Sequence, residues 1–457
     1  MSENVYQIDF NKPESVHFIG IGGISMSGLA EILMDEGFTV SGSDAHRSEL
    51  TDNLEARGAK VYIGQKAENI QDGIDVVVYT AAIHPDNPEF QEVKRRGIPM
   101  LTRAELLGEM MRNYKNAIAI AGTHGKTTTT SMVTEIFLQA KNDPTISVGG
   151  ILPAIGGPEF FVTEACEYTN SFLSFYPTMA VILNIEEDHL DFFKDLADIR
   201  HSFKLFAERV PAQGAIVING DIENYQEIIE AAKGKVITFG HSRGNDYSAG
   251  DIQYDDYAHP SFDLYIGGEK KERLTLGVAG EHNVYNALAA IAVSLENGIS
   301  MDAIRAGLAH FTGTNRRFEK KGEVNGFTII DDYAHHPHEI EATLKTAQNY
   351  PHKTLWCIFQ PHTYTRTKAF LPQFAEALSL ADKVILADIY AARETDTLGI
   401  SSEDIVKLLK EKGKEAWYLP TFDEIEKFVM EHCTQGDLLI TMGAGDVVNV
   451  GENLLAK

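Results

Sequence analysis

The sequence predicts an α/β protein of three domains, with open, mainly parallel sheets in the two outer domains and a mixed sheet in the middle one. Two observations predict this class. Short apolar runs alternate with helical patterns along most of the chain, and 457 residues exceed what one hydrophobic core usually serves. We place the domains at residues 1–113, 114–318 and 319–457.

The first domain opens with a strand, a glycine turn, a helix and a second strand, the unit typical of Rossmann-like sheets that bind nucleotides. Its G-x-G-x-x-G fingerprint is broken, because Ser25 holds the third glycine position. Asp44 stands where a ribose-binding acid would lie, so a nicotinamide-dependent dehydrogenase remains an alternative. The pattern predicts strands at 16–21, 38–41, 75–80 and 99–101, and a helix at 27–36.

The middle domain begins with AIAIAGTHGKTTTT at 117–130, the sharpest signal in the chain. Gly122 and Gly125 let backbone N–H groups face phosphate oxygens. Lys126 adds a positive charge, and Thr127 offers a hydroxyl to Mg²⁺. The loop is a shortened P-loop, because Ile120 holds the first glycine position. It predicts a P-loop ATPase-like domain, and the alternative is a purely structural turn.

Polar residues follow several predicted strands of the middle domain, where ligands of open α/β sheets bind. Thr127, Glu164 and His189 would suit a hard cation, although a lone histidine such as His189 is more often a hydrogen-bonded loop residue. We expect the neighbouring acids to be solvated or to orient the loop: Glu167, Glu186, Glu187 and Asp191. The pattern predicts strands at 160–164, 179–184, 215–219 and 236–239, an antiparallel ribbon at 247–276 and a helix at 283–295.

The last domain follows a charged stretch at 313–326 that is typical of a boundary. The motif DDYAHHPHE at 331–339 joins a strand to a helix and suits an anion or ribose hydroxyls, unless it only caps the helix. Arg366 is a candidate carboxylate or phosphate clamp. Arg316 and Arg317 lie at the hinge, as phosphate ligands or as ordinary hinge charges. The pattern predicts strands at 327–331, 354–360, 383–387 and 437–442, and helices at 337–347, 369–380, 404–412 and 422–432.

Composition excludes several classes of function. The formal charge of −26 disfavours nucleic acid and anionic lipid as partners. The three cysteines form no CxxC pair, which fits a reducing compartment without a zinc site. Neither a secretory signal nor an apolar run of membrane-spanning length is visible. We therefore expect a cytoplasmic protein without membrane insertion.

Together these motifs resemble those of the Mur ligases, which build the peptide stem of bacterial peptidoglycan. The resemblance covers nearly the whole chain and is most specific for the members that join L-alanine to UDP-N-acetylmuramate. The motifs that carry it, in order, are HFIGIGGISMSGLAE with SGSD, AGTHGKTTTT, EACEYTNSFL, NIEEDHLD, GEHNVYNA, GTNRRF, DDYAHHPHE and QPHTYTRT.

The resemblance implies an amide ligase that uses ATP and Mg²⁺, with the N-terminal domain on the UDP-sugar, the central domain on ATP and a C-terminal Rossmann-like domain that closes over it. ATP would convert the muramyl carboxylate to an acyl phosphate, which the alanine amine would attack. The implied substrates are UDP-N-acetylmuramate and L-alanine, and we expect a monomer or weak homodimer.

The resemblance also implies a role for individual residues. Lys126, His189, His335 and Arg366 would be catalytic, the last two facing the incoming amino acid. The UDP-sugar set is Gly22, Gly23, Ser25, Met26, Ser27 and Asp44; the ATP set is Gly122, Thr123, His124, Gly125, Lys126, Thr127, Thr128, His282, Asn283, Asn286, Arg317 and Asp332; the Mg²⁺ set is Thr127, Glu164 and His189.

Two departures from the family pattern limit this transfer. Many relatives have an acid where Cys166 stands and an arginine where Thr363 stands, so the role of Cys166 and the group that holds the alanine carboxylate stay open. The nearest alternative is a recycling ligase that adds an intact tripeptide to the same UDP-sugar. A nucleotide-switched binding module is the non-enzymatic alternative.

Overall fold

A computed structural model describes residues 6–80, 82–148, 151–392, 394–396 and 398–456. The chain divides into two compact units. The first holds Met1–Ile185 with Arg200–Ile237, and the second holds Glu186–Ile199 with Thr238–Lys457. The helix α6 (Leu196–Ala207) and the strand β12 (Lys235–Gly240) each contain a point of division. The three domain ranges expected from the sequence stay a prediction.

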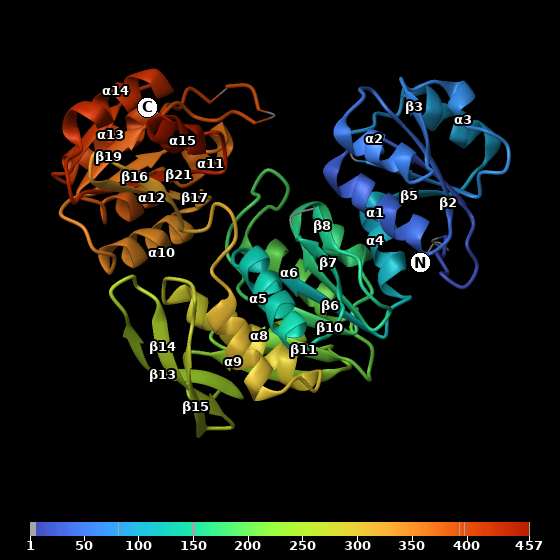
Figure 1. Cartoon of the computed structure of the whole chain (residues 1–457), viewed down its shortest axis with the longest axis horizontal. Helices are drawn as coiled ribbons and strands as arrows, with labels where there is room; N and C mark the ends of the chain where they lie inside the picture. The colour runs from blue at the N-terminus through green and yellow to red at the C-terminus, as the bar shows by residue number, and fades with distance from the viewer. Residues whose placement is uncertain (1–5, 81, 149–150, 393, 397, 457) are drawn as a thin grey trace. The chain divides into compact units, whose positions relative to one another are not determined.

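The first unit opens with a five-stranded, wholly parallel sheet of order β3-β2-β1-β4-β5 (Figure 1). Its central strands are buried, as the run Val76–Val78 shows with no exposed surface, and such apolar runs are typical of strands covered on both faces. The elements are β1 Ser15–Ile19, α1 Ile24–Asp35, β2 Thr39–Asp44, α2 Glu49–Ala56, β3 Lys60–Ile63, the 3₁₀ turn η1 Ala67–Asn69, β4 Val76–Tyr79, α3 Pro88–Arg96, β5 Met100–Thr102 and α4 Arg103–Met111.

The strands of the second sheet that belong wholly to this unit follow in the order β11-β10-β6-β9-β7-β8, and this part of the sheet is mixed, because β8 runs antiparallel to β7. The strand β6, which precedes the phosphate loop, lies between β10 and β9 and pairs with both in parallel. The elements are β6 Asn116–Ala121, α5 Lys126–Gln139, β7 Thr145–Val148, β8 Ile151–Ala154, β9 Phe160–Ala165, the 3₁₀ segment η2 Tyr168–Ser174, β10 Met179–Ile182, β11 Ala215–Asn219 and α7 Tyr225–Ile229.

The second unit contains an antiparallel ribbon, two helices and a six-stranded sheet of order β16-β17-β21-β18-β19-β20. All of that sheet is parallel except β16. The elements are β13 Tyr247–Tyr254, β14 Pro260–Ile266, β15 Glu269–Thr275, α8 His282–Glu296, α9 Met301–His310, β16 Glu319–Val324, β17 Phe327–Asp332, α10 Pro337–Gln348, β18 Leu355–Phe359, α11 Tyr364–Ala369, α12 Leu371–Leu378, β19 Lys383–Leu386, α13 Ser402–Glu411, β20 Glu415–Tyr418, α14 Phe422–His432, β21 Leu438–Met442 and α15 Val448–Ala456.

Alternation along β18 builds two cores, one on each face of this sheet. Leu355 and Cys357 pack with α10, α12 and α13, whereas Trp356 and Ile358 pack with α14 and α15. Successive side chains of a strand point to opposite faces, so one apolar run serves both layers of helices. Each large apolar side chain buried in this way stabilises the fold by about 1.5–3 kcal/mol.

The predicted α/β class, with parallel outer sheets and a mixed middle sheet, is confirmed. Several boundaries were wrong. Helix α1 begins at Ile24 rather than residue 27, because the glycine turn is shorter than expected. The predicted helix 369–380 corresponds to α12, Leu371–Leu378, and the short helix α11, Tyr364–Ala369, which ends just before Phe370, was not predicted. The charged stretch 313–326 contains the edge strand β16, whose apolar content is too low for a strand pattern.

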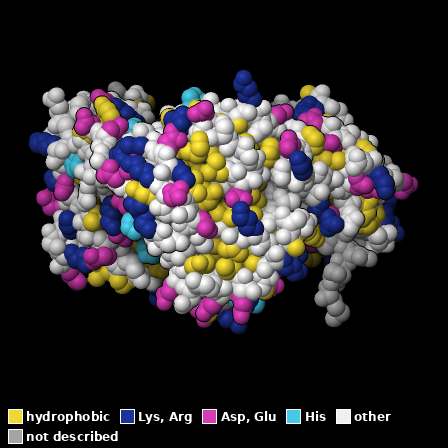
Figure 2. Space-filling model, turned by 90° about the horizontal axis from the view of Figure 1, so that it is seen from below, with side chains coloured by type: hydrophobic (Ala, Val, Ile, Leu, Met, Phe, Trp, Pro, Cys, Tyr) yellow, Lys and Arg dark blue, Asp and Glu magenta, His cyan; other side chains and the backbone are white. Residues whose placement is uncertain are grey.

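The helices of the described residues include none that combines the length and the hydropathy needed to cross a bilayer. On the face drawn in Figure 2, the basic side chains that the structure describes lie singly or in small groups among acidic ones. That surface agrees with the large excess of acidic residues in the sequence.

Candidate active site

The phosphate loop has the backbone geometry that the sequence predicts. Gly125 adopts a left-handed φ of 83° and ends the loop directly before α5, where no side chain caps the helix. Gly122 has a φ of 150°, and a Cβ there would lie 2.9 Å from the Cβ of Leu183. The first N–H groups of α5 therefore stay available for an anion.

Asn184 braces this loop, a role that the sequence did not predict. Its side-chain oxygen accepts a hydrogen bond of 2.8 Å from the His124 N–H, and its amide donates one of 3.1 Å to the His124 carbonyl. The Thr123 N–H donates to the backbone carbonyl of Asn184 over 3.3 Å. Because Asn184 follows β10, the neighbouring strand fixes the loop.

Lys126 is held at the mouth of the loop by a buried carboxylate. Its Nζ donates to the carbonyls of Gly122 and Thr123 and lies 3.2 Å from Oε2 of Glu167. Burial lowers the pKa of Lys126, but Glu167, together with Cys166 and Glu164, outweighs it and the pKa stands above its ordinary value. The expectation that Glu167 is solvated or only orients its loop was wrong, because its side chain is 3% exposed and paired with Lys126.

Glu164 and Thr127 fit a hard cation. Glu164 lies on β9 opposite Ile120 of β6, so its carboxylate stands at the edge where the phosphate loop begins. Among the described residues, its Oε1 is buried and accepts no hydrogen bond. A carboxylate oxygen without a hydrogen-bond donor and a threonine hydroxyl are oxygen donors of the kind that Mg²⁺ prefers. His189, the third predicted ligand, belongs to the other unit, so the complete set stays a prediction.

The glycine turn of the first sheet is built around Asp44. Oδ2 of Asp44 accepts a hydrogen bond of 2.9 Å from the Gly22 N–H, and a Cβ on Gly22 would lie 2.9 Å from that oxygen. Gly23 precedes α1 without any side-chain cap. The predicted substrate residues Met26 and Ser27 have buried side chains, and the Ser27 N–H donates to the Gly23 carbonyl over 2.9 Å. Ser25 is half-buried in the same first turn.

A buried carboxylate supports this turn, and the sequence analysis missed it. Glu89 has no exposed surface and accepts hydrogen bonds from Ser43 Oγ (2.6 Å) and Asn69 Nδ2 (2.5 Å), while Nε2 of His17 lies 3.6 Å away. The carbonyl of Ser43 in turn accepts the N–H groups of Gly20 and Ile21. The sequence signal was an acid in the first turn of a helix that begins Asn-Pro-Glu.

In the second unit, the turn between β17 and α10 holds a neutral histidine. Burial lowers the pKa of His335 to about 4. Its Nδ1 contacts the Tyr333 carbonyl at 3.0 Å, so Nδ1 carries the proton and Nε2 keeps a lone pair. Glu339 caps the turn by accepting the His335 N–H over 3.1 Å. Asp332 accepts the N–H groups of Phe318 and Ala334, each over 2.8 Å, and burial raises its pKa to about 6.

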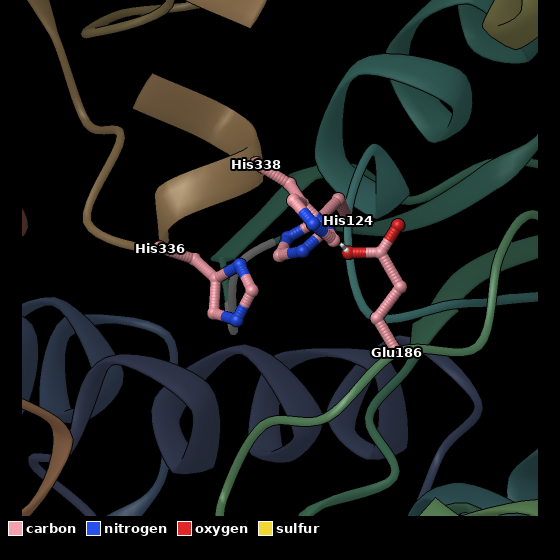
Figure 3. Close-up of side chains that lie close together, drawn as sticks. All are labelled: His124, Glu186, His336 and His338. Atoms are coloured by element: carbon pink, nitrogen blue, oxygen red, sulfur yellow. Dashed lines mark hydrogen bonds and ion pairs between the residues drawn. The ribbon is translucent and has the colours of Figure 1, made fainter. Parts of the chain in front are cut away.

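Residues 186–189 lie against the same turn within this unit. His338 is hydrogen-bonded to Glu186 (Figure 3). Nε2 of His336 donates to the Glu187 carbonyl over 2.9 Å. Glu186 is therefore paired rather than solvated, and so is Asp188, which the sequence analysis left unassigned. His189 has a left-handed φ of 52° and lies 3.8 Å from Asp188.

Arg366 is engaged by Asp188 rather than free. Its Nε and Nη2 both donate to Oδ1 of Asp188, over 3.2 and 2.9 Å, and Nη1 donates to Nδ1 of His362 over 3.1 Å. Burial raises the pKa of Asp188, but Arg366 holds it below its ordinary value. His362, which the sequence analysis overlooked, lies 5.8 Å ring to ring from His335, and burial lowers its pKa to about 4.

The two arginines of the predicted hinge, Arg316 and Arg317, make different contacts. Arg316 donates to Asp331 and to the carbonyls of Gly443 and Gly445, which makes it structural. Arg317 has a weaker partner, Glu339 at 3.8 Å, and lies over the Tyr333 ring. Only Arg317 is therefore in a position to take on a phosphate without giving up strong bonds.

The residues predicted for adenine lie together at the start of α8. Asn283 donates to the Ala279 carbonyl over 2.7 Å, and Asn286 donates to Asn283 over 3.0 Å. Burial lowers the pKa of His282 to about 4, so its ring is neutral. Gly280 has a φ of 99°, and a Cβ there would lie 2.6 Å from that ring. Thr128, the last predicted phosphate residue, is half-buried in the first turn of α5.

A phosphate loop with a braced lysine and a second uncapped glycine turn define a nucleotide-using α/β protein. The sequence matches three family descriptions: "Mur ligase family, catalytic domain" at residues 15–115, "Mur ligase middle domain" at 120–294 and "Mur ligase, glutamate ligase domain" at 316–445. The chain belongs to the Mur ligase family, and the expected three-domain architecture is confirmed.

Named relatives and solved structures show which members of the family this chain is similar to. UDP-N-acetylmuramate–L-alanine ligases of Lachnospira eligens and Agathobacter rectalis are 62% and 61% identical, covering 99% of this chain and all of theirs. The crystal structure of the UDP-N-acetylmuramate-alanine ligase of Thermotoga maritima is similar at 29% identity, with a TM-score of 0.76 over 97% of this chain and 98% of that one. A murein peptide ligase of Psychrobacter arcticus matches at 25% identity and a TM-score of 0.66, over 97% and 98%.

Proposed function

We propose that this chain joins L-alanine to UDP-N-acetylmuramate at the expense of ATP, in the synthesis of peptidoglycan precursors. The observation that carries the proposal is the phosphate loop with Lys126 held on Glu167, in a chain that is more than 60% identical to two relatives of that name over their whole length. A carboxylate does not condense with an amine in water, so the energy of ATP has to make it an electrophile.

The residues of the first unit support the phosphoryl transfer. The uncapped start of α5 offers N–H groups to the phosphates of ATP, and Lys126 offsets the negative charge that builds up when a phosphate approaches a carboxylate. A bound Mg²⁺ would add Lewis-acid polarisation of the phosphates, with Thr127 and Glu164 as its ligands in this unit. The glycine turn at Gly22 and Gly23 would hold the diphosphate of the UDP-sugar through its backbone.

The residues of the second unit support the amide-forming step. His335 is neutral at physiological pH and keeps a lone pair on Nε2, which can hydrogen-bond the alanine ammonium as it loses the proton that it has to give up before it attacks. His362 is also neutral, and its Nδ1 accepts a hydrogen bond from Arg366. Arg366 offers its positive charge to a carboxylate or phosphate of the substrates, which then has to share the guanidinium with Asp188. Arg317 and the His282 region are assigned to ATP. We propose the cytoplasm as the compartment, because all three cysteines are free thiols, and a monomer or weak dimer as the active form.

Phosphate release tests this function directly. The purified chain is given ATP, Mg²⁺ and UDP-N-acetylmuramate, with L-alanine or with the tripeptide L-alanyl-γ-D-glutamyl-meso-diaminopimelate as acceptor. We expect release that depends on the UDP-sugar and is fastest with L-alanine. Faster release with the tripeptide would assign the chain to the recycling ligases, and release without any UDP-sugar would refute both.

A further inference from the structure

Arg103 is a half-buried cation without an acidic partner. It is the first residue of α4 and follows β5, so it starts at the carboxyl edge of the first sheet, where ligands of such sheets bind. Among the described residues, no carboxylate pairs with its guanidinium. The one ionisable side chain that acts on the pKa of Arg103 is the thiol of Cys166. Burial lowers the pKa of Arg103, which remains a cation.

Partly buried arginines such as Arg316 and Arg366 are paired with carboxylates, and acidic residues outnumber basic ones 66 to 40. Arg209 and Arg243, which also have no carboxylate partner among the described residues, are exposed and lie over tyrosine rings. Partial burial of a charge costs free energy unless a counter-charge offsets it. An unpaired guanidinium in so acidic a chain therefore indicates an anionic ligand rather than a contribution to stability.

The location of Arg103 identifies the anion. Helix α4, which Arg103 begins, packs on η2, the segment that follows β9 and Cys166 at the end of the central sheet that carries the phosphate loop. Cys166 also acts electrostatically on Arg103. Helix α4 is fixed there, because it packs on η2 so closely that a Cβ on Gly108 would lie 1.9 Å from the Ser174 carbonyl oxygen. The glycine turn of the first sheet, by contrast, follows β1, two strands away from β5.

We propose that Arg103 binds the muramyl carboxylate of UDP-N-acetylmuramate and holds it toward the γ-phosphate of ATP. This inference rests on the proposed function. In the step it assists, a carboxylate oxygen forms a bond to the γ-phosphorus, the bond from that phosphorus to the β,γ-bridging oxygen breaks, and ADP leaves with the electron pair. No proton moves, and the fork of Arg103 offsets the negative charge of the attacking group.

Binding of two UDP-sugars tests the assignment without ATP. UDP-N-acetylglucosamine lacks the 3-O-lactyl group of UDP-N-acetylmuramate, which carries the carboxylate, and is otherwise the same ligand. We expect R103Q to weaken the muramate by about 10- to 100-fold, the range for losing a hydrogen bond to a charged group, and to leave the glucosamine unchanged in calorimetry. R103K keeps the charge without the fork and is expected to fall between. R95Q, a change at an arginine that is 69% exposed, is the control.

Three outcomes would overturn the proposal. Unchanged muramate binding by R103Q would show that Arg103 does not reach the carboxylate. An equal loss for both sugars would place the contact at the diphosphate or in the fold, and a wild-type chain that binds both equally would show that no group holds the carboxylate. Phosphate release by the wild type with L-alanine is measured in parallel, so a failure of the proposed function is recognised separately.

Discussion

The two glycine turns of the first unit differ in one respect that matters for chemistry. Both lead into helices whose first N–H groups have no side-chain cap, unlike α4, where Thr102 and Glu105 form a capping box. The turn before α1 faces a carboxylate, Asp44, and its residues include no cation. The turn before α5 carries Lys126, held in place by Glu167.

This difference indicates that the chain binds the diphosphate of the UDP-sugar and the transferred phosphoryl group of ATP in different ways. A diphosphate that only has to stay bound needs N–H groups and a tight turn. A phosphoryl group that moves toward an anion also needs a positive charge at the point of transfer. The unit thus uses the same backbone device twice and adds charge where bonds change.

Replacing Lys126 by alanine should produce the largest effect and would break the comparison if it did not. We expect kcat to fall by about 1,000-fold or more, because positive charge at the transferring phosphate contributes on that scale, while the Kd for UDP-N-acetylmuramate stays unchanged. Phosphate release and calorimetry measure the two. Lys115→Ala, at a lysine that is 74% exposed, is the control. Normal ligation by the Lys126 variant would refute the assignment of the loop.

Glu167→Gln sharpens the comparison because it keeps the amine of Lys126 in the loop and changes only how readily that amine is protonated. The pKa of Lys126 is raised in the wild type because Glu167, together with Cys166 and Glu164, outweighs the effect of burial. Glutamine removes the charge of Glu167, so the pKa of Lys126 falls. We therefore expect the alkaline limb of the kcat–pH profile to move to lower pH, with a loss of about 10-fold at its alkaline end.

Glu159→Gln is the control for this variant, at a glutamate that is 58% exposed in the same unit. The UDP-sugar Kd should remain independent of pH over the same range in both variants. A Glu167→Gln profile that overlays the wild type would mean that Lys126 does not depend on this carboxylate.

Asp44→Asn should produce the smallest effect. Asparagine keeps an oxygen for the Gly22 N–H and removes a negative charge close to the expected diphosphate. If Asp44 only braces the turn, the variant should bind the UDP-sugar slightly more tightly, by less than about 1 kcal/mol of binding free energy. A clear loss of affinity would instead show that the carboxylate binds a ribose hydroxyl. Asp52→Asn, on the exposed face of α2, is the control.

Local sequence was sufficient wherever function depends on the backbone. The strands β1 and β6, both glycine turns and the helices behind them follow from apolar runs and glycine positions, because turn geometry is decided by a few adjacent residues. The edge strand β16 and the short helix α11 were missed, since one is mostly charged and the other is too short to show a helical pattern.

Pairing between distant residues was beyond the sequence. Arg316 and Arg317 are adjacent and chemically identical, yet contacts with Asp331, Gly443 and Gly445 make the first structural and leave the second available. The sequence predicts a solvated or loop-orienting acid at Glu167, whereas in the structure this carboxylate is paired with Lys126, 41 residues earlier. The same holds for Asp188 and Arg366, which are 178 residues apart.

The sequence by itself determined the class of sheet, the places where phosphates are received and the family. Only the tertiary structure decided which charges are already neutralised and which, like that of Arg103, remain for a ligand. The physical reason is that glycine turns and apolar periodicity are local properties of the backbone. The electrostatic state of a side chain depends instead on burial and on partners that folding brings from elsewhere in the chain.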